Sequence, residues 1–201
     1  MSAIWINGWG LCRRYTRNIV ASQYPNIEHT VINPDIDWSD QLEKLPISAT
    51  LLGYSLGAFL LLSRPDLRKR FQRVVLLAPF VDFKRESDLG GKVRRAQLHY
   101  LQRWLKRDPG GALSDFWDQA NIGHPPLNES DLDPVMLDWG VSRLLEGALD
   151  RDVLSEEESW VGSEDSLLDA SKLAKINPKL NIVNGVGHGL EELLSQSGIE
   201  L

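Results

Sequence analysis

Hydrophobic positions along the chain form short, nearly continuous runs, which alternate with longer stretches of helical periodicity. A short apolar run is typical of a strand buried on both faces of a sheet, and the longer pattern of an amphipathic helix. The runs predict strands at residues 3–7, 28–33, 48–54, 73–79, 158–163 and 180–185. The stretches between them predict helices at about 12–22, 38–45, 55–63, 167–176 and 189–196. This alternation predicts an α/β fold with about six parallel strands and helices on both faces.

Residues 80–150 interrupt the alternation, because they show helical patterning and no convincing strand. Within GGKVRRAQLHYLQRWLKR, residues 90–107, the apolar residues recur near one face and the basic residues cover the others. Gly90-Gly91 stand at its start and Pro109-Gly110-Gly111 follow its end, and such residues are typical of turns. We expect a helical lid inserted at about 82–130, within a single domain that spans residues 1–201.

Composition narrows the class of protein. The chain has 201 residues, a net charge of −6 and a single cysteine, Cys12. One domain of this size can bury a substantial core, and an acidic balance argues against general nucleic-acid binding. A lone cysteine excludes an internal disulfide framework and fits a reducing compartment. With neither a basic leader nor an apolar run long enough to span a bilayer, we expect a cytoplasmic monomer without a membrane span.

The segment LLGYSLGAF, residues 51–59, places Ser55 between two glycines, after a predicted strand and before a predicted helix. Such a turn lifts a serine hydroxyl to the carboxyl edge of a parallel sheet, where α/β proteins bind ligands. The pattern is short and also fits a tight turn without chemistry. As a nucleophile, Ser55 needs a base to take its proton and a third group to orient that base.

His188 is the candidate base among four histidines. It lies in NGVGHGLEELL, directly after the last predicted strand, and therefore at the same sheet edge as Ser55. We interpret His29, His99 and His124 as surface or lid residues.

The orienting carboxylate is expected at another strand end, in WVGSEDSLLD. Asp165 directly follows the strand in a G-x-x-D turn, whereas Asp169 falls within the next predicted helix. Glu164 is the main rival, with a longer side chain and a less suitable position in the turn. The chain order Ser55, Asp165, His188, with each residue at a strand end, is far more specific than the serine motif alone.

Oxyanion donors are expected in INGWGL, residues 6–11, where the first strand ends in a turn flanked by glycines. We call residues 7–11 the oxyanion loop. The backbone N–H groups of Trp9 and of Leu56, the residue after the serine, are the natural pair of donors. The alternative is that Gly8 and Gly10 only allow the chain to turn. The Trp9 side chain is also a candidate wall for the substrate.

These motifs together resemble the α/β-hydrolase family over nearly the full chain, from N-G-W-G through G-Y-S-L-G and G-S-E-D to G-x-G-H. The family usually has two further strands before the oxyanion strand, so the resemblance implies a fold trimmed at the N-terminus. Family members usually carry His-Gly at the oxyanion turn, where this chain has Asn7-Gly8. Within the family, NGWGL with LLGYSLG most resembles the pimeloyl-acyl-carrier-protein methyl ester esterases of biotin synthesis, whose helical lid meets the carrier protein.

The lid segment is strongly basic. Between Lys84 and Arg107 eight basic residues stand against two acidic ones, Glu86 and Asp88, so the segment carries +6 and the rest of the chain −12. This polarity would steer an acidic partner, such as an acyl carrier protein, to the lid. The expected contacts include Arg94, Arg95, Arg103 and Arg107. A solvated helix face is the alternative.

The expected chemistry is hydrolysis of a small or carrier-bound acyl ester by Ser55, His188 and Asp165, without cofactor or metal. No Cys or His spacing suggests a metal site. Phe116 and Trp117, in LSDFWDQANIG, are candidate walls for an acyl chain and equally plausible as ordinary lid packing. A thioesterase or lyase could use the same three residues. An alternative of another class is a hydrolase-like binding protein without activity.

Overall fold

The computed structural model describes residues 1–126, 133–155 and 157–201, and within them six parallel strands form one sheet in the order β2-β1-β3-β4-β5-β6. The strands are β1 (Ser2–Ile6), β2 (Glu28–Ile32), β3 (Thr50–Tyr54), β4 (Val74–Leu77), β5 (Ser159–Gly162) and β6 (Asn181–Val183). The predicted parallel α/β sheet is therefore confirmed. The strands β2 to β6 lie inside their predicted ranges, and β1 begins one residue earlier than predicted.

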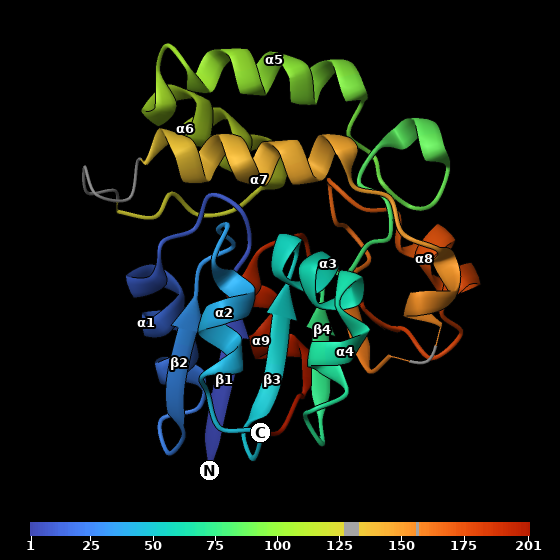
Figure 1. The fold of residues 1–201 in the computed structure, drawn as a ribbon. Helices are drawn as coiled ribbons and strands as arrows, with labels where there is room; N and C mark the ends of the chain where they lie inside the picture. Colours follow the sequence, from blue (N-terminus) through green and yellow to red (C-terminus); the bar gives the residue numbers. More distant parts are fainter. Residues whose placement is uncertain (127–132, 156) are drawn as a thin grey trace.

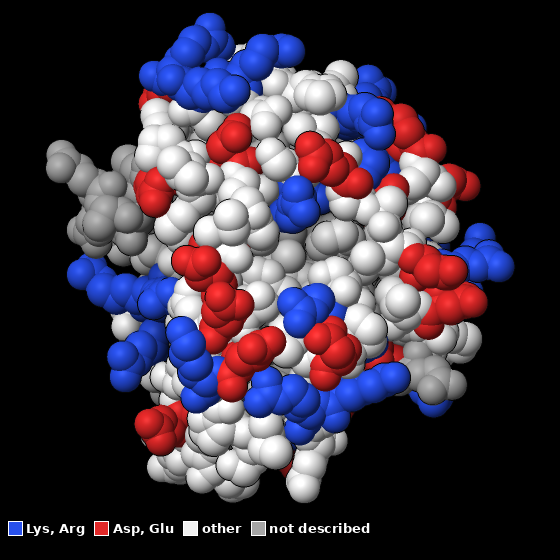
Figure 2. All heavy atoms as spheres, in the orientation of Figure 1, with Lys and Arg blue, Asp and Glu red and all other residues white. Residues whose placement is uncertain are grey.

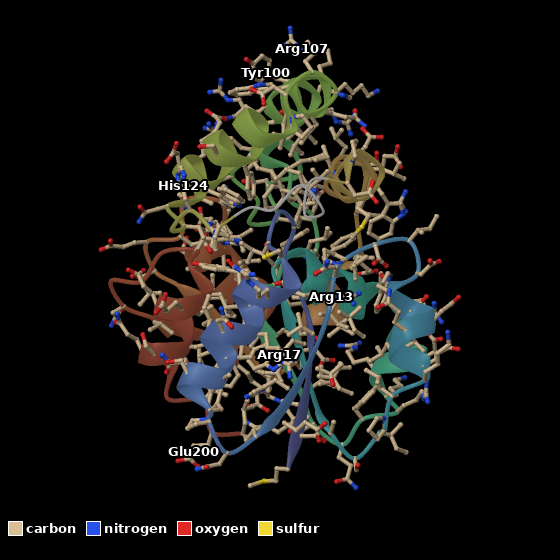
Figure 3. The ribbon with its side chains drawn as sticks, turned by 90° about the vertical axis from the view of Figure 1, so that its left-hand side faces the viewer. Arg13, Arg17, Tyr100, Arg107, His124 and Glu200 are labelled. Atoms are coloured by element: carbon tan, nitrogen blue, oxygen red, sulfur yellow. The ribbon has the colours of Figure 1, made fainter. Side chains whose placement is uncertain are left out.

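Helices cover both faces of the sheet (Figures 1 and 3). They are α1 (Arg13–Gln23), α2 (Trp38–Glu43), α3 (Leu56–Ser63), α4 (Pro65–Arg68), α8 (Ala170–Ile176) and α9 (Leu190–Ser197). Helices α1 and α9 pack against each other on one face, and α2 and α3 lie on the other. Helix α3 is apolar on every side and buried from Leu56 to Leu62, because the sheet and the lid enclose it.

Three further helices lie above the carboxyl ends of the strands and form the lid (Figure 1). They are α5 (Arg95–Leu105), α6 (Pro109–Ala120) and α7 (Pro134–Glu146), and they come between β4 and β5 along the chain, flanked by short 3-10 helices at Arg85–Ser87 and Arg151–Leu154. Asp108 and Asp133 cap α6 and α7 by accepting backbone N–H bonds. The predicted end of the lid, at about residue 130, falls outside the described residues, and α7 continues the lid beyond it.

One histidine belongs to the core rather than to the surface. His29, in β2, is 9% exposed; its Nδ1 accepts from Trp5 Nε1 at 3.1 Å, and its Nε2 lies 3.0 Å from the Tyr24 carbonyl oxygen. Both ring nitrogens are thus paired, which makes His29 a structural residue and corrects its interpretation as a surface residue. His99 is exposed on α5, and His124 is exposed shortly after α6.

None of the helices in the described ranges has the length and apolar character needed to cross a membrane.

Candidate active site

Ser55 occupies a strained turn between β3 and α3. Its φ of 52° and ψ of −115° lie where a side chain is rarely accommodated, and the residue is 7% exposed. The turn packs closely on the end of β1, because a Cβ on Gly57 would collide with the Ile6 carbonyl oxygen. Only glycine fits there, so the second glycine of GYSLG is a condition for placing Ser55 beside the oxyanion loop.

The structure brings the predicted base and acid to this serine. His188 Nε2 lies 3.0 Å from Ser55 Oγ, and His188 Nδ1 lies 2.7 Å from Asp165 Oδ2. His188 and Asp165 are each 1% exposed. The second oxygen of Asp165 accepts the backbone N–H groups of Leu167 and Leu168 at 2.8 and 2.9 Å, which fixes the carboxylate within its own turn.

The rival carboxylates lie elsewhere. Glu164 is exposed, and only its backbone N–H bonds inward, to the Val186 carbonyl. Asp169 caps α8 by accepting the backbone N–H groups of Ser171 and Lys172. Of the three acidic residues, Asp165 is the one hydrogen-bonded to His188.

Tyr54 supports His188 and is absent from the residues singled out in the sequence. Its hydroxyl donates to the His188 carbonyl oxygen at 2.7 Å, and the two rings lie 5.5 Å apart between centroids. Burial, with a smaller contribution from the charge of Asp165, raises the pKa of Tyr54 well above its usual value. The phenol therefore remains a donor. In the sequence Tyr54 looks like any aromatic residue of a buried strand.

Lys92 supports Asp165 from the start of the lid. Its Nζ donates to the Asp165 carbonyl oxygen, and its backbone N–H donates to the Leu167 carbonyl at 2.9 Å. Gly91 forms an isolated bridge with Leu168. The segment that leads into the lid is thus bonded along the turn that carries the acid.

Asn7 fixes the oxyanion loop. Its Oδ1 accepts from Gly8 N at 3.0 Å and from the Thr16 hydroxyl at 2.8 Å, and its Nδ2 donates to the Leu11 carbonyl at 2.8 Å. Asn7 therefore holds the oxyanion loop through its side chain. A Cβ on Gly8 would lie 3.5 Å from Ser55 Cβ, so this loop borders the serine.

The two expected oxyanion donors come from elements that meet at Ser55. Leu56 is the first residue of α3, where a backbone N–H has no partner within the helix. Trp9 lies in the oxyanion loop, and its indole is held against the lid: Nε1 donates to the Leu137 carbonyl at 3.0 Å. The Trp9 and Phe116 rings are also in contact and perpendicular, with centroids 4.7 Å apart.

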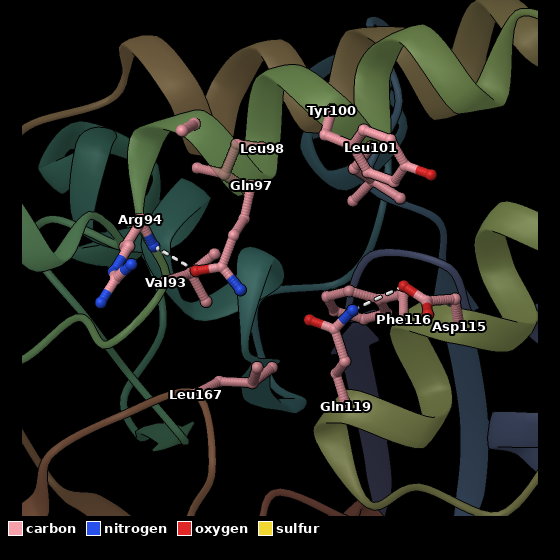
Figure 4. Close-up of a pocket in the computed structure, with 11 residues that line it drawn as sticks. Val93, Arg94, Gln97, Leu98, Tyr100, Leu101, Asp115, Phe116, Gln119 and Leu167 are labelled. Atoms are coloured by element: carbon pink, nitrogen blue, oxygen red, sulfur yellow. Dashed lines mark hydrogen bonds between the residues drawn. The ribbon is translucent and has the colours of Figure 1, made fainter.

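Phe116 and Trp117 have different positions. Phe116 lines a cavity of about 270 Å³ between α5, α6 and Leu167, shown in Figure 4. Trp117 instead donates through Nε1 to the Gly10 carbonyl at 3.1 Å and is 2% exposed, so it attaches α6 to the oxyanion loop. Adjacent helix residues face different directions, so Phe116 lines this cavity and Trp117 packs on the oxyanion loop; a role for either in binding substrate stays a prediction.

The basic residues of the lid are mostly at the surface. Arg94, Arg95, Arg103 and Arg107 are exposed, and Figure 2 shows basic atoms at both ends of the upper, lid side of the molecule. Lys84 is different: it is buried, 2.8 Å from Asp82 Oδ1, and it donates to the Gly147 carbonyl. One of the eight predicted charges is therefore neutralised inside the protein.

Chemically, a buried carboxylate, an imidazole and a hydroxyl in hydrogen-bonded sequence can transfer the hydroxyl proton to the ring and make the oxygen a nucleophile. Backbone N–H groups beside the hydroxyl can stabilise negative charge on a substrate oxygen. Within the described residues, no group of three His, Cys, Asp or Glu side chains is arranged to hold a metal ion.

Neither a protein-family model nor a curated protein matches the sequence. Solved structures do match. A hydrolase from Oleispira antarctica, olei00960, is 12% identical, with a TM-score of 0.71 over 98% of this chain and 87% of that one. BioG from Haemophilus influenzae is 10% identical, with a TM-score of 0.64 over 96% and 90% of the two chains.

A thermophilic esterase from Thermogutta terrifontis is 13% identical, with a TM-score of 0.63 over 94% of this chain and 82% of that one. At such low identity these likenesses concern the fold alone. Together with the sheet of six parallel strands, they show that the chain has the α/β-hydrolase fold.

Proposed function

We propose that this protein is a serine hydrolase that cleaves carboxylic esters through an acyl-enzyme. The observation that carries the proposal is the continuous set of hydrogen bonds from Asp165 through His188 to Ser55, at the carboxyl edge of the sheet. The same three residue types in this chain order are the catalytic set of the α/β-hydrolase motif.

In the first step, Ser55 Oγ attacks the ester carbonyl carbon while its proton passes to His188 Nε2. Asp165 keeps the other ring nitrogen protonated and stabilises the imidazolium. The backbone N–H groups of Trp9 and Leu56 bind the oxygen that becomes negative, and one such donor contributes about 3 kcal/mol to the transition state. The ester C–O bond then breaks, and the alcohol takes the proton from His188.

In the second step, His188 takes a proton from water, and the resulting nucleophile attacks the acyl carbon. The proton returns to Ser55 Oγ as the acyl–serine bond breaks, which releases the carboxylic acid. Tyr54 and Lys92 act on this cycle indirectly, by holding the main chain at His188 and at Asp165.

For the natural substrate we propose a carrier-bound ester, with the methyl ester of pimeloyl-acyl-carrier-protein as the specific candidate. The support is the resemblance of NGWGL and LLGYSLG to that esterase group, together with the exposed arginines of the lid. The basic segment 84–107 would attract a small acidic carrier protein. The likeness to BioG, at 10% identity, adds support for the fold only.

Labelling with a fluorophosphonate tests the nucleophile directly, because this reagent forms a stable bond with an activated serine oxygen. We expect one equivalent to attach to the wild-type protein, with mass spectrometry placing it on the peptide that contains Ser55. The His188→Ala variant should label far more slowly, since the hydroxyl then lacks its base.

Ser63 provides the control, because it lies at the far end of the helix that Ser55 begins and donates to a backbone carbonyl. The Ser63→Ala variant should label like the wild type. Absence of labelling, or labelling that persists without His188, would contradict a serine hydrolase and favour a binding protein. Labelling together with preference for thioesters over esters would keep the catalytic residues and change the substrate class.

A further inference from the structure

The last turn of α6 lies against all three segments that carry the candidate catalytic groups. These segments are the oxyanion loop, the acid turn (residues 163–169) and the His188 loop (residues 184–189). Trp117 Nε1 donates to the Gly10 carbonyl of the oxyanion loop at 3.1 Å. The Ser166 hydroxyl, in the acid turn, donates to the Gln119 carbonyl at 2.7 Å. One helix end thus bonds to two catalytic segments that are distant from each other in the sequence.

Asn121 places the same helix end beside the third segment, the His188 loop. A Cβ on Gly187 would lie 3.8 Å from Asn121 Nδ2, and a Cβ on Gly189 would lie 4.0 Å from the Asn121 carbonyl oxygen. Separations of this size are ordinary van der Waals contact. Asn121 therefore borders the residues directly before and directly after His188.

The way in which α6 ends makes the Gln119 carbonyl available to Ser166. The last carbonyls of an α-helix have no partner within the helix. Asn121 has a left-handed backbone, with a φ of 52°, and its N–H bonds to the Asp118 carbonyl at 3.1 Å. The N–H of the next residue bonds to the Trp117 carbonyl at 2.9 Å. This pair of bonds is the Schellman arrangement, which leaves the Gln119 carbonyl for the Ser166 hydroxyl.

Ser166 is the residue directly after the candidate acid. Asp165 Oδ2 lies 2.7 Å from His188 Nδ1, so movement of the acid turn would change the distance that orients the imidazole. The hydroxyl of Ser166 limits such movement, because it attaches the turn to α6. Gln119 and Leu167, the residue after Ser166, accordingly line one cavity, which Figure 4 shows. Reacting groups must stay within a fraction of an ångström of their productive positions.

We propose that Ser166 is a positioning residue, and that the last turn of α6 is a fixed part of the catalytic framework. It holds the acid turn and the His188 loop in place relative to the oxyanion loop. The proposal rests on the proposed ester hydrolysis and adds residues that the mechanism above does not use. Ser166 acts through Asp165, and not on the substrate.

Removal of the Ser166 hydroxyl tests the proposal. In Ser166→Ala, kcat for a p-nitrophenyl ester should fall roughly threefold to tenfold with KM unchanged, because one hydrogen bond that orients the acid is lost. Ser166→Thr keeps a hydroxyl and should restore kcat. A fall in kcat that Ser166→Thr does not restore, or no fall in Ser166→Ala, would overturn the assignment of Ser166.

Ser155→Ala is the matched control. The Ser155 hydroxyl also donates to a backbone carbonyl, that of Asp152, at 2.8 Å. Ser155 precedes β5, however, and so lies at the opposite end of that strand from Asp165. The control variant should therefore keep the kcat of the wild type. An equal fall in Ser155→Ala and Ser166→Ala would contradict a specific role for Ser166.

Two substitutions at Asn121 test the helix end itself. A β-branched residue does not readily adopt a left-handed backbone, whereas glycine does. Asn121→Val should therefore displace the helix end and lower kcat at least about threefold, whereas Asn121→Gly should keep kcat within about twofold of the wild type. A lower melting temperature for Asn121→Val with an unchanged kcat would assign the helix end to the fold alone.

Nitrogen NMR with isotope-labelled histidine separates this proposal from the proposed function. The chemical shifts of the His188 ring report its tautomer and its bond to Asp165, whether or not the protein hydrolyses an ester. They should change in Ser166→Ala and Asn121→Val and match the wild type in Ser155→Ala. If they change but the wild type hydrolyses no ester, positioning by α6 stands and the catalytic proposal fails. If they are the same in all these proteins, positioning by α6 fails.

Discussion

Two residues of the candidate triad, Asp165 and His188, are held in place by groups that take no part in the reaction itself. Asp165 is fixed by two backbone N–H groups and by Lys92, and His188 by the Tyr54 hydroxyl. Such support keeps reacting groups within a fraction of an ångström of their productive positions. Variants at this scale therefore separate the groups that react from the groups that position them.

The Asp165→Asn variant tests which carboxylate serves His188. An amide at this position cannot stabilise the imidazolium, so kcat should fall on the order of 10⁴-fold. Circular dichroism should remain that of the wild type, because the side chain keeps its shape. The neighbouring Glu164→Gln change should leave kcat near its original value; a steep loss there and not at Asp165 would move the acid to Glu164.

The Tyr54→Phe variant tests the support of His188. Removal of the hydroxyl costs the hydrogen bond to the His188 carbonyl, and loss of roughly 1 kcal/mol in the transition state would slow kcat about fivefold without raising KM. The Tyr24→Phe variant is the matched control, because the Tyr24 hydroxyl also donates to a backbone carbonyl, that of Ile199, at 2.9 Å. It should lower the melting temperature without slowing kcat. Equal kcat for both variants would assign Tyr54 to the fold alone.

At the scale of elements, the lid helix α7 meets the oxyanion loop at Gly140. A Cβ on Gly140 would collide with the Trp9 indole, whose Nε1 already donates to the Leu137 carbonyl one turn earlier. Close packing of this kind leaves no room for a methyl group. The position of α7 and the position of the Trp9 backbone N–H are therefore coupled.

The Gly140→Ala variant tests this coupling. Overpacking should destabilise the protein by roughly 1–3 kcal/mol and displace Trp9, so kcat should fall as well. Gly110→Ala is the control within the lid, since the nearest atom to its added Cβ lies 3.8 Å away. That variant should be as stable as the wild type or more so. An unchanged melting temperature and kcat for Gly140→Ala would show that α7 and the loop are not coupled.

The hydrophobic pattern of the sequence predicted the sheet well, because a strand buried on both faces consists of a nearly continuous run of apolar residues. It also placed Ser55 and His188 at one sheet edge, since parallel strands all end there. The lid was harder. Its helices are amphipathic, but the local sequence does not indicate that α7 packs on Trp9, that Trp117 donates to the Gly10 carbonyl, or that Lys84 is buried and donates to the Gly147 carbonyl. These contacts join segments that are distant in the sequence or lie at helix faces that periodicity alone cannot orient.

At the scale of the whole molecule, positive charge is concentrated in residues 84–107, at the start of the lid and along α5, whereas residues 108–146 contain eight acidic residues and one basic residue. Arg95 and Arg103 are exposed on α5, and Arg94 and Arg107 are exposed just before and just beyond it; Figure 3 shows Arg107 at the lid end and Arg17 on the side of the sheet. The net charge of the whole chain is −6, so the basic segment 84–107 is a local feature. An electrostatic field of this kind changes the rate at which a charged partner associates with the protein more than it changes the rate of the chemical step.

Charge reversal tests whether the lid steers a carrier protein. Arg103→Glu combined with Arg107→Glu should lower kcat/KM for an acyl-carrier-bound ester about tenfold or more, with little effect on a free ester. The double variant Arg14→Glu with Arg17→Glu is the control, because it changes the net charge by the same amount on α1. It should leave kcat/KM for both substrates unchanged. High salt should slow only the carrier-bound reaction, because the Debye length falls to about 3 Å at 1 M. Equal losses on both substrates would argue against steering.

The central claim, that Ser55 is an activated nucleophile, is tested most directly by the hydrolysis of a short p-nitrophenyl ester by the wild type and by Ser55→Ala. We predict turnover in the wild type and a fall in kcat on the order of 10⁶-fold in the variant, down to the rate without enzyme. An unchanged fold by circular dichroism would assign that loss to the missing hydroxyl. Turnover by Ser55→Ala at the wild-type rate would contradict the account.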